Sequence, residues 1–171
     1  MTVITTGKRM DLYPAKTEDI DIIMNLENAN ENKNFVWQGS YEEHMSEIDD
    51  PSYILAVFRE KSDNRIVGYV LAGVDRRSDV FELRRIVVAE KGRGYGREAM
   101  SLLMDYAFNI LHINRFWLDV YPDNFVGINL YKSLGMKHEG TLRQSYRSER
   151  GYLDQMIFSI LKEEYFLKNT G

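Results

Sequence analysis

The stretch EKGRGYGREAM, residues 90–100, constrains the fold of this chain more than any other. Its three glycines, Gly92, Gly94 and Gly96, lie between the apolar run 80–88 and a run whose apolar residues recur at helical spacing. The first run is typical of a strand and the second of an amphipathic helix. Glycines at such a junction allow a positive φ or a close approach of the backbone to a ligand. The chain therefore has to fit a strand, a tight glycine loop and a helix together in that order.

The runs around this unit indicate a mixed sheet. Residues 52–59 and 65–75 are apolar runs joined by a polar turn, which predicts an antiparallel hairpin beside the 80–88 strand. A strand expected at 115–120 follows the glycine-loop helix and completes one β-α-β crossover. Further strands are expected at 10–14, 136–142 and 152–161, and further helices at 17–30, 41–48 and 124–134. Antiparallel hairpins followed by one crossover predict a mixed sheet with helices on its faces.

Composition excludes several classes of protein. A length of 171 residues predicts a single domain. The chain has no cysteine, which excludes disulfides, thiolate metal sites and cysteine nucleophiles. It has no long apolar run and no signal-peptide pattern, so we expect no membrane span and a cytoplasmic protein. An isoelectric point near 5.5 without a basic aromatic stripe argues against nucleic-acid binding, and the three histidines lack ligand spacing, so we expect no metal.

The charge is distributed unevenly along the chain. Residues 18–50 hold ten acids and one base, a net charge of −9, whereas the whole chain carries −4 and the remainder therefore +5. One interpretation is two solvated helix faces. The other is an acidic wall that attracts a cationic substrate.

The glycine loop is open to several interpretations. Residues 94–99 match the G-x-G-x-x-G/A dinucleotide fingerprint, and Asp119 follows where a ribose-binding acid lies in that fold. That fingerprint belongs to a doubly wound parallel sheet, however, whereas hairpins precede this loop. A P-loop needs Gly-Lys-Ser/Thr, which is absent, and a purely structural turn remains an alternative. We favour a pyrophosphate held by successive backbone N–H groups at the start of a helix, with Arg93 or Arg97 on a further phosphate.

Two segments resemble the GCN5-related N-acetyltransferase (GNAT) family, whose members transfer acetyl from acetyl-CoA to amines. The first is ELRRIVV and KGRGYG, residues 82–88 and 91–96, which is similar to the family's Q/R-x-x-G-x-G/A loop with Lys91 for Gln or Arg. The second is NFVGINLYKSLGM, residues 124–136, similar to N-x-x-A-x-x-L-Y-x-x-x-G-F with Gly127 for Ala. The end of the chain, GYLD and then KEEY, resembles the branch that contains ribosomal-protein and spermidine acetyltransferases.

The resemblance covers about residues 8–165 of a domain expected to span 1–171. It implies a GNAT-type α+β fold: a mixed, mostly antiparallel sheet of about six to seven strands with helices on both faces, in three α/β/α layers. It also implies acetyl-CoA as cosubstrate, without a metal. The residues that the resemblance assigns to cofactor binding are Ile86, Val87, Val88, Lys91, Gly92, Arg93, Gly94, Tyr95, Gly96, Arg97, Asn124 and Tyr131.

The resemblance implies two catalytic residues. Tyr131 stands where the family's tyrosine protonates the departing thiolate, and a phenol with an ordinary pKa of about 10 keeps its proton at neutral pH. A tyrosine that only packs on the sheet is the alternative. Glu82 stands where several members place a base that acts through water; its alternative is a carboxylate paired with Arg84 on the same strand face. Asn124 is expected to cap its helix and to bind the cofactor.

The sequence says less about the amine acceptor than about the cofactor and the catalytic residues. In this fold the loop between the first two helices lines the acceptor side, so Phe35, Trp37 and Tyr41 are expected either to contact the acceptor or to pack. Because the acidic segment lies on the same side, we expect a small-molecule or peptide amine that is cationic, such as a polyamine. The alternative function is a CoA-binding sensor or scaffold without efficient transfer. The sequence leaves the oligomeric state open, with a homodimer as one option.

Overall fold

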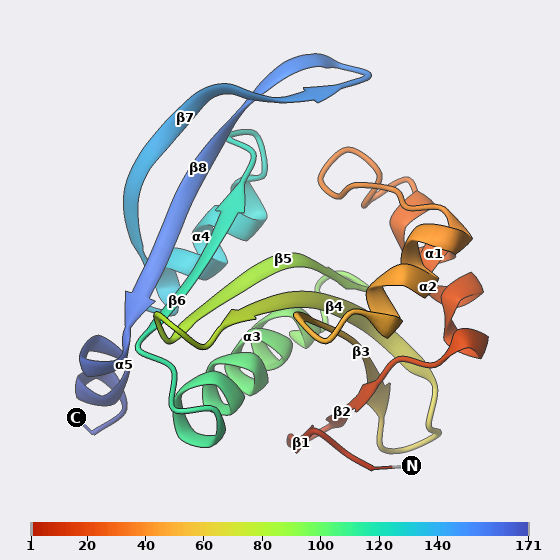
Figure 1. Cartoon of the computed structure of the whole chain (residues 1–171), viewed down its shortest axis with the longest axis horizontal. Helices are drawn as coiled ribbons and strands as arrows, with labels where there is room; N and C mark the ends of the chain where they lie inside the picture. Colours follow the sequence, from red (N-terminus) through yellow and green to blue (C-terminus); the bar gives the residue numbers. More distant parts are fainter. Residues whose placement is uncertain (1, 171) are drawn as a thin grey trace.

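The computed structural model describes residues 2–170, which form one eight-stranded sheet with helices on both faces (Figure 1). The strand order is β1-β2-β3-β4-β5-β6-β8-β7, and every neighbouring pair is antiparallel except β5 and β6. The strands are β1 (Thr5–Thr6), β2 (Met10–Pro14), β3 (Tyr53–Glu60), β4 (Ile66–Asp75), β5 (Val80–Val88), β6 (Arg115–Val120), β7 (Lys137–Ser148) and β8 (Gly151–Leu161). The helices are α1 (Ile20–Asn28), α2 (Tyr41–Asp49), α3 (Tyr95–Asp105), α4 (Phe125–Ser133) and α5 (Lys162–Asn169).

The predicted mixed, mostly antiparallel sheet is confirmed, with eight strands instead of six to seven. The additional strand is β1, which has only two residues and no apolar pattern of its own. The prediction for β7 ended at residue 142, whereas the strand runs to Ser148. Its second half is exposed on both faces, because the β7–β8 hairpin projects beyond the helices that cover the sheet (Figure 1), and an apolar pattern is therefore absent there.

The sheet has a core on each face, which gives three layers. The larger core lies under α3 and α4 and includes Phe81, Phe108 and Phe116. The rings of Phe81 and Phe116 stack with centroids 4.9 Å apart, which joins the two parallel strands β5 and β6. The smaller core lies under α1 on the opposite face and includes Ile23 and Tyr69. Burial on both faces fixes the register of the central strands.

The parallel pair β5 and β6 separates part-way along its length. The last paired residues are Leu83 and Leu118, and beyond them β5 continues to Val88 beside β4 alone. The β4–β5 register shifts at this point: Leu71 pairs with Arg85 and Ala72 with Leu83, so Arg84 is an extra residue in β5. A bulge of this kind bends a strand and changes its twist. The bend at Arg84 therefore opens a gap between the ends of β5 and β6.

Candidate active site

The gap between β5 and β6 opens into a cavity of about 930 Å³. Four parts of the chain enclose it: the loop between α1 and α2, the second half of β5 with the glycine loop, the end of β6 with the start of α4, and the β7–β8 hairpin. The residues singled out from the sequence that line this cavity are Phe35, Trp37, Glu82, Ile86, Val87, Val88, Lys91, Gly92, Gly94, Tyr95, Gly96, Arg97, Asn124 and Tyr131. Arg93 and Tyr41 lie outside the lining. Segments far apart in the sequence therefore meet around one space.

The glycine loop adopts the conformation that its sequence suggests. Gly92 and Gly94 have φ of +84° and +78°, and Gly94 is the residue before the first turn of α3. A Cβ on Gly92 would meet no atom within 4 Å, so this glycine is needed for its backbone conformation and not for lack of space. The start of α3 directs unpaired N–H groups and the positive end of the helix dipole toward the cavity. These groups can bind an anion such as a pyrophosphate.

The side chains of Arg9 and Glu60 hold the glycine loop from outside the cavity. Arg9 donates from Nη1 to the carbonyl of Arg93 at 2.8 Å and from Nε to Glu98 at 2.9 Å, and its guanidinium lies 4.6 Å from the ring centroid of Tyr95. The Tyr95 hydroxyl donates to Glu60 at 2.5 Å. Tyr95 is buried, so its side chain anchors the loop, and what it offers a ligand is its backbone. Neither Arg9 nor Glu60 carries a sequence signal for this role.

The three cations of the loop differ in their surroundings. Burial lowers the pKa of Lys91, which lines the cavity near Glu31. Arg97 donates to the hydroxyl of Ser133 at 2.6 Å and joins the start of α3 to α4. Arg93 pairs with Glu90 at 2.8 Å on the surface. Lys91 and Arg97 are thus the cations available inside the cavity from this loop.

Tyr131 and Asn124 come from α4. Tyr131 is 8% exposed and lines the cavity, and burial, followed by the nearby charge of Asp119, raises its pKa to about 12. Within residues 2–170 its hydroxyl makes no hydrogen bond. The side-chain oxygen of Asn124 accepts the N–H of Gly127 at 3.0 Å and caps α4. A Cβ on residue 127 would lie 2.9 Å from the Asn124 amide, so glycine here leaves room for that cap.

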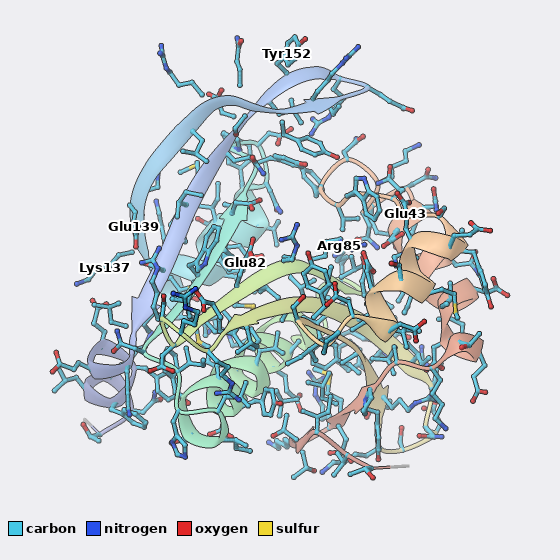
Figure 2. The ribbon with its side chains drawn as sticks, viewed as in Figure 1. Glu43, Glu82, Arg85, Lys137, Glu139 and Tyr152 are labelled. Carbon is cyan, nitrogen blue, oxygen red and sulfur yellow. The ribbon has the colours of Figure 1, made fainter. Side chains whose placement is uncertain are left out.

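Two carboxylates lie near the point where β5 and β6 separate. Glu82 on β5, labelled in Figure 2, is paired with Arg84 at 3.4 Å, which is the alternative that the sequence offered. Asp119 on β6 accepts a hydrogen bond from Gln155 at 3.0 Å. Burial raises the pKa of Asp119, and the negative charge of Glu82 adds to the increase. Sequence reasoning considered Asp119 only as a ribose ligand, although an acid at the end of the strand after the crossover helix was a signal for a site residue.

The loop between α1 and α2 is held by a buried polar cluster. We call it the Glu27 cluster; its members are Glu27, His44, Glu47, Tyr69 and Arg85. Glu27 accepts hydrogen bonds from the N–H of Gly39, from the Tyr69 hydroxyl and from Arg85, and it faces His44 Nε2 at 3.2 Å.

Trp37 is the cavity residue that this cluster supports. The Arg85 guanidinium lies 4.5 Å from the ring centroid of Trp37, on the α1/α2 side of β5. Figure 2 labels Arg85 and Glu82, which both come from this strand. The cluster therefore fixes one wall of the cavity.

The acidic segment does not face the cavity as a whole. Asp19 pairs with Arg59, and Glu27 and Glu47 belong to the Glu27 cluster. Glu43 lies on the outer surface of α2 and completes the cap at Ser40 (Figure 2). Of the acids at 18–50 only Glu31 and Glu47 line the cavity, where further carboxylates come from the rest of the chain: Glu82, Glu90, Asp119 and Asp123. The charge of the 18–50 segment was thus a poor guide to the charge of the site.

The β7–β8 hairpin adds residues that sequence reasoning missed. Tyr146 from β7 packs on Tyr121 with ring centroids 5.7 Å apart, and both line the cavity. Arg150 at the end of the hairpin binds Asp123 and the carbonyl of Asn34, each at 2.7 Å. Within residues 2–170 no group of three or more His, Asp or Glu is arranged to hold a metal, and no helix is long and apolar enough to cross a membrane.

Comparisons with known proteins agree with this geometry. The model of the acetyltransferase (GNAT) family matches residues 20–136. The N-acetyltransferase p20 of Bacillus licheniformis, itself uncharacterized, is 39% identical over 74 residues, which is 43% of this chain and 42% of that protein. Spermidine N(1)-acetyltransferase of Vibrio cholerae is 23% identical over 171 residues, with 93% of this chain and 96% of that protein covered.

A solved structure extends the likeness over nearly the whole fold. Spermidine N-acetyltransferase of V. cholerae in complex with CoA and spermine has a TM-score of 0.82 at 23% identity, over 92% of this chain and 98% of that one. A family match over most of the chain, the glycine loop before α3 and the separated β5 and β6 lead to one conclusion. The chain belongs to the acetyltransferase (GNAT) family and is an acetyl-CoA-dependent N-acetyltransferase.

Proposed function

We propose that this protein transfers the acetyl group of acetyl-CoA to a cationic primary amine, by direct attack within a ternary complex. The observation that carries the proposal is the single cavity in which the loop amides, the unpaired edge of β5 and the free hydroxyl of Tyr131 meet. Acetyl-CoA supplies an activated acetyl group whose transfer leaves a thiolate. The residues of the chain have to bind the pyrophosphate, orient the thioester and move two protons.

The glycine loop fits the pyrophosphate. Positive φ at Gly92 and Gly94 turns the backbone so that successive N–H groups converge in front of α3, and Lys91 and Arg97 add positive charge. The edge of β5 beyond Leu83 faces the cavity instead of a neighbouring strand, so N–H groups among Ile86, Val87 and Val88 are available to the thioester arm. Preorganised backbone donors of this kind contribute roughly 2.7–4 kcal/mol each to transition-state stabilisation in acyl transfer.

Tyr131 is the proposed acid. Its pKa of about 12 keeps the Oη proton in place throughout the neutral range, so the group is always ready to donate. A hydroxyl without a protein partner, in a cavity wall, can reorient toward the leaving sulfur. Proton donation at that moment avoids releasing a free thiolate into a desolvated site.

Glu82 is the proposed base for the incoming ammonium, acting through water. Its carboxylate lies on the face of β5 that carries Arg85 and Trp37, the side from which the acceptor is proposed to enter. The pairing with Arg84 is long, at 3.4 Å, and partly exposed, so an ammonium can replace Arg84. Asp119 adds a second carboxylate at the same place and is held by Gln155.

Two observations support a cationic acceptor. The cavity wall carries carboxylates from four parts of the chain, and aromatic rings of Phe35, Trp37, Tyr121 and Tyr146 line the same space. Carboxylates and aromatic faces both attract ammonium groups. Relatives with the same fold are spermidine acetyltransferases, which act on such a cation. A polyamine or a peptide amine is therefore the proposed class.

An amine panel with detection of released thiol tests the function. Spermidine, N-terminal peptides and aminoglycosides cover the cationic classes, and neutral amines serve as comparison. We expect Tyr131→Phe to lower kcat by about 10²-fold or more while the KM for acetyl-CoA changes little. Tyr152→Phe, at an exposed position on the hairpin (Figure 2), is the matched control and should behave like the wild type. Binding of acetyl-CoA without turnover of any amine would support a CoA-binding sensor instead.

A further inference from the structure

Arg150 joins the two rims of the cavity. It lies in the turn between β7 and β8, far along the hairpin from the body of the sheet (Figure 1). Its Nη1 binds Asp123, which precedes α4, and its Nη2 binds the carbonyl of Asn34 in the loop between α1 and α2. Asp123 lines the cavity itself, and Asn34 lies between the lining residues Asn32 and Phe35. We call these two contacts the Arg150 bridge.

The Arg150 bridge links the β7–β8 hairpin to both rims of the cavity. One rim is the loop between α1 and α2, which belongs to the smaller core, and the other is the start of α4, which belongs to the larger core. The hairpin passes over the space between them and contributes Tyr146 and Gln155 to the lining. An acceptor that enters between these two rims therefore has to pass the Arg150 bridge.

The Arg150 bridge is weak enough to break and form again. The side chains of Arg150 and Asp123 are 36% and 51% exposed. Exposed ion pairs contribute little to stability, so breaking one shifts an equilibrium by about fivefold at most. Tyr146 also holds the hairpin to Tyr121 on the α4 side, whereas Tyr152 next to the turn is exposed, and the contact from the turn to the loop between α1 and α2 is the one from Arg150 to Asn34. The open and closed arrangements are therefore close in free energy, and the bridge sets their ratio.

We propose that Arg150 is a specificity-determining residue, whose bridge admits slender amines to the proposed acceptor site and restricts bulky ones. The proposal rests on the proposed acetyl transfer. It narrows the acceptor class to amines at the end of a thin, flexible chain, such as a polyamine or an extended peptide. Bulky amines react only from the open arrangement, so their apparent affinity is reduced by the fraction of molecules that are open.

Acceptor kinetics give the first test. Spermidine serves as the slender acceptor and an aminoglycoside as the bulky one, and the ratio of their kcat/KM values is compared between variants. Arg150→Gln should raise the bulky-to-slender ratio by up to about fivefold, the limit set by the strength of an exposed ion pair. Arg147→Gln removes the same charge from the same hairpin, where the structure gives Arg147 no side-chain partner among residues 2–170, and should leave the ratio unchanged. An unchanged ratio in Arg150→Gln overturns the proposal.

Amide hydrogen exchange gives a test that does not depend on activity. In Arg150→Gln, exchange in the 31–37 loop and in the 148–151 turn should rise together by up to about fivefold, and Asp123→Asn, which leaves the Asn34 contact, should produce a smaller rise. The double variant should exchange no faster than Arg150→Gln alone, because that change already removes both contacts. If exchange in these two segments is unaffected, the bridge does not close the cavity. If exchange rises but the wild type acetylates no amine, the proposed function fails and the closure stands.

Discussion

The Glu27 cluster makes a prediction about stability and pH. It holds two carboxylates, Glu27 and Glu47, against Arg85 and His44, while the Tyr69 hydroxyl donates to Glu27. The His44 side chain has no exposed surface. A protonated His44 makes the four charged groups neutral as a set, whereas a neutral one leaves a net buried negative charge. Hydrogen bonds and charges of the two glutamates outweigh desolvation and raise the pKa of His44 to about 9.

The magnitude follows from linkage between protonation and folding. The unfolded imidazole has a pKa of about 6.5, so the folded protein binds the proton more tightly by about 2.5 pKa units, or about 3 kcal/mol. Because the folded pKa is the higher one, this contribution is complete below about pH 6.5 and disappears as the pH rises through about 9. At pH 7.5 about 2 kcal/mol of it remains, and at pH 9 less than about 0.5 kcal/mol.

Urea unfolding at several pH values measures this contribution. The free energy of unfolding of the wild type should fall by about 3 kcal/mol more between pH 6 and pH 9 than that of His44→Gln, which has no titrating group at this position. His138→Gln, at an exposed position on β7, is the control and should keep the slope of the wild type. Parallel curves for the wild type and His44→Gln would refute a charged His44 and, with it, the balance of charges in the cluster.

Two further changes probe the site itself. Gly94→Ala puts a Cβ on a residue with φ of +78°, which costs about 1–2 kcal/mol, so the KM for acetyl-CoA should rise about 5- to 30-fold; Gly140→Ala, in a strand with open space around it, should leave that KM unchanged. Glu82→Gln should lower kcat at pH 7 by about 10²-fold or more, and the deficit should shrink above about pH 9, where more of the amine is deprotonated without a base. A deficit of constant size across the pH range would mean that Glu82 does not remove the proton.

The elements around the glycine loop could be predicted because each carries a strong local pattern. The alternation in β5, the glycines and the apolar face of α3 place both ends of the strand and the start of the helix within two residues of their observed positions. Asn124 was expected to cap α4 and does so, because an asparagine before an apolar helix is a local signal. The β7–β8 hairpin carries no such pattern in its distal half, since neither face there is buried. Its length, and with it the position of Arg150, became known only from the structure.

Residues that act through long-range contacts left no trace in the sequence. Glu27, His44 and Arg85 are separated by up to 58 positions and meet in one buried cluster. Read along the chain, Glu27 and Glu47 were two of ten acids in a segment that suggested an acidic wall. Their burial turns them into structural ion pairs. Local composition reports how many charges a segment has, whereas tertiary packing decides which of them a substrate can meet.

The extra residue at Arg84 links the fold to the proposed chemistry. Before it, Phe81 and Leu83 face the larger core; after it, Ile86 and Val88 do, because one inserted residue reverses the alternation. Glu82 and Arg85 consequently lie on the same face, the one that carries the Glu27 cluster.

The sequence does record this shift, as a spacing of three between Leu83 and Ile86 in an otherwise alternating strand. Without the bulge, Arg85 would point into the larger core and the loop that carries Trp37 would lose its contact with β5. The same bend separates β5 from β6 and exposes the backbone edge proposed to bind the thioester. The extra residue at position 84 thus separates β5 from β6, places Glu82 and Arg85 on one face of the strand and keeps Arg85 in contact with Trp37. An insertion or deletion at position 84 should therefore remove the gap, the position of the proposed base and the support of Trp37 together.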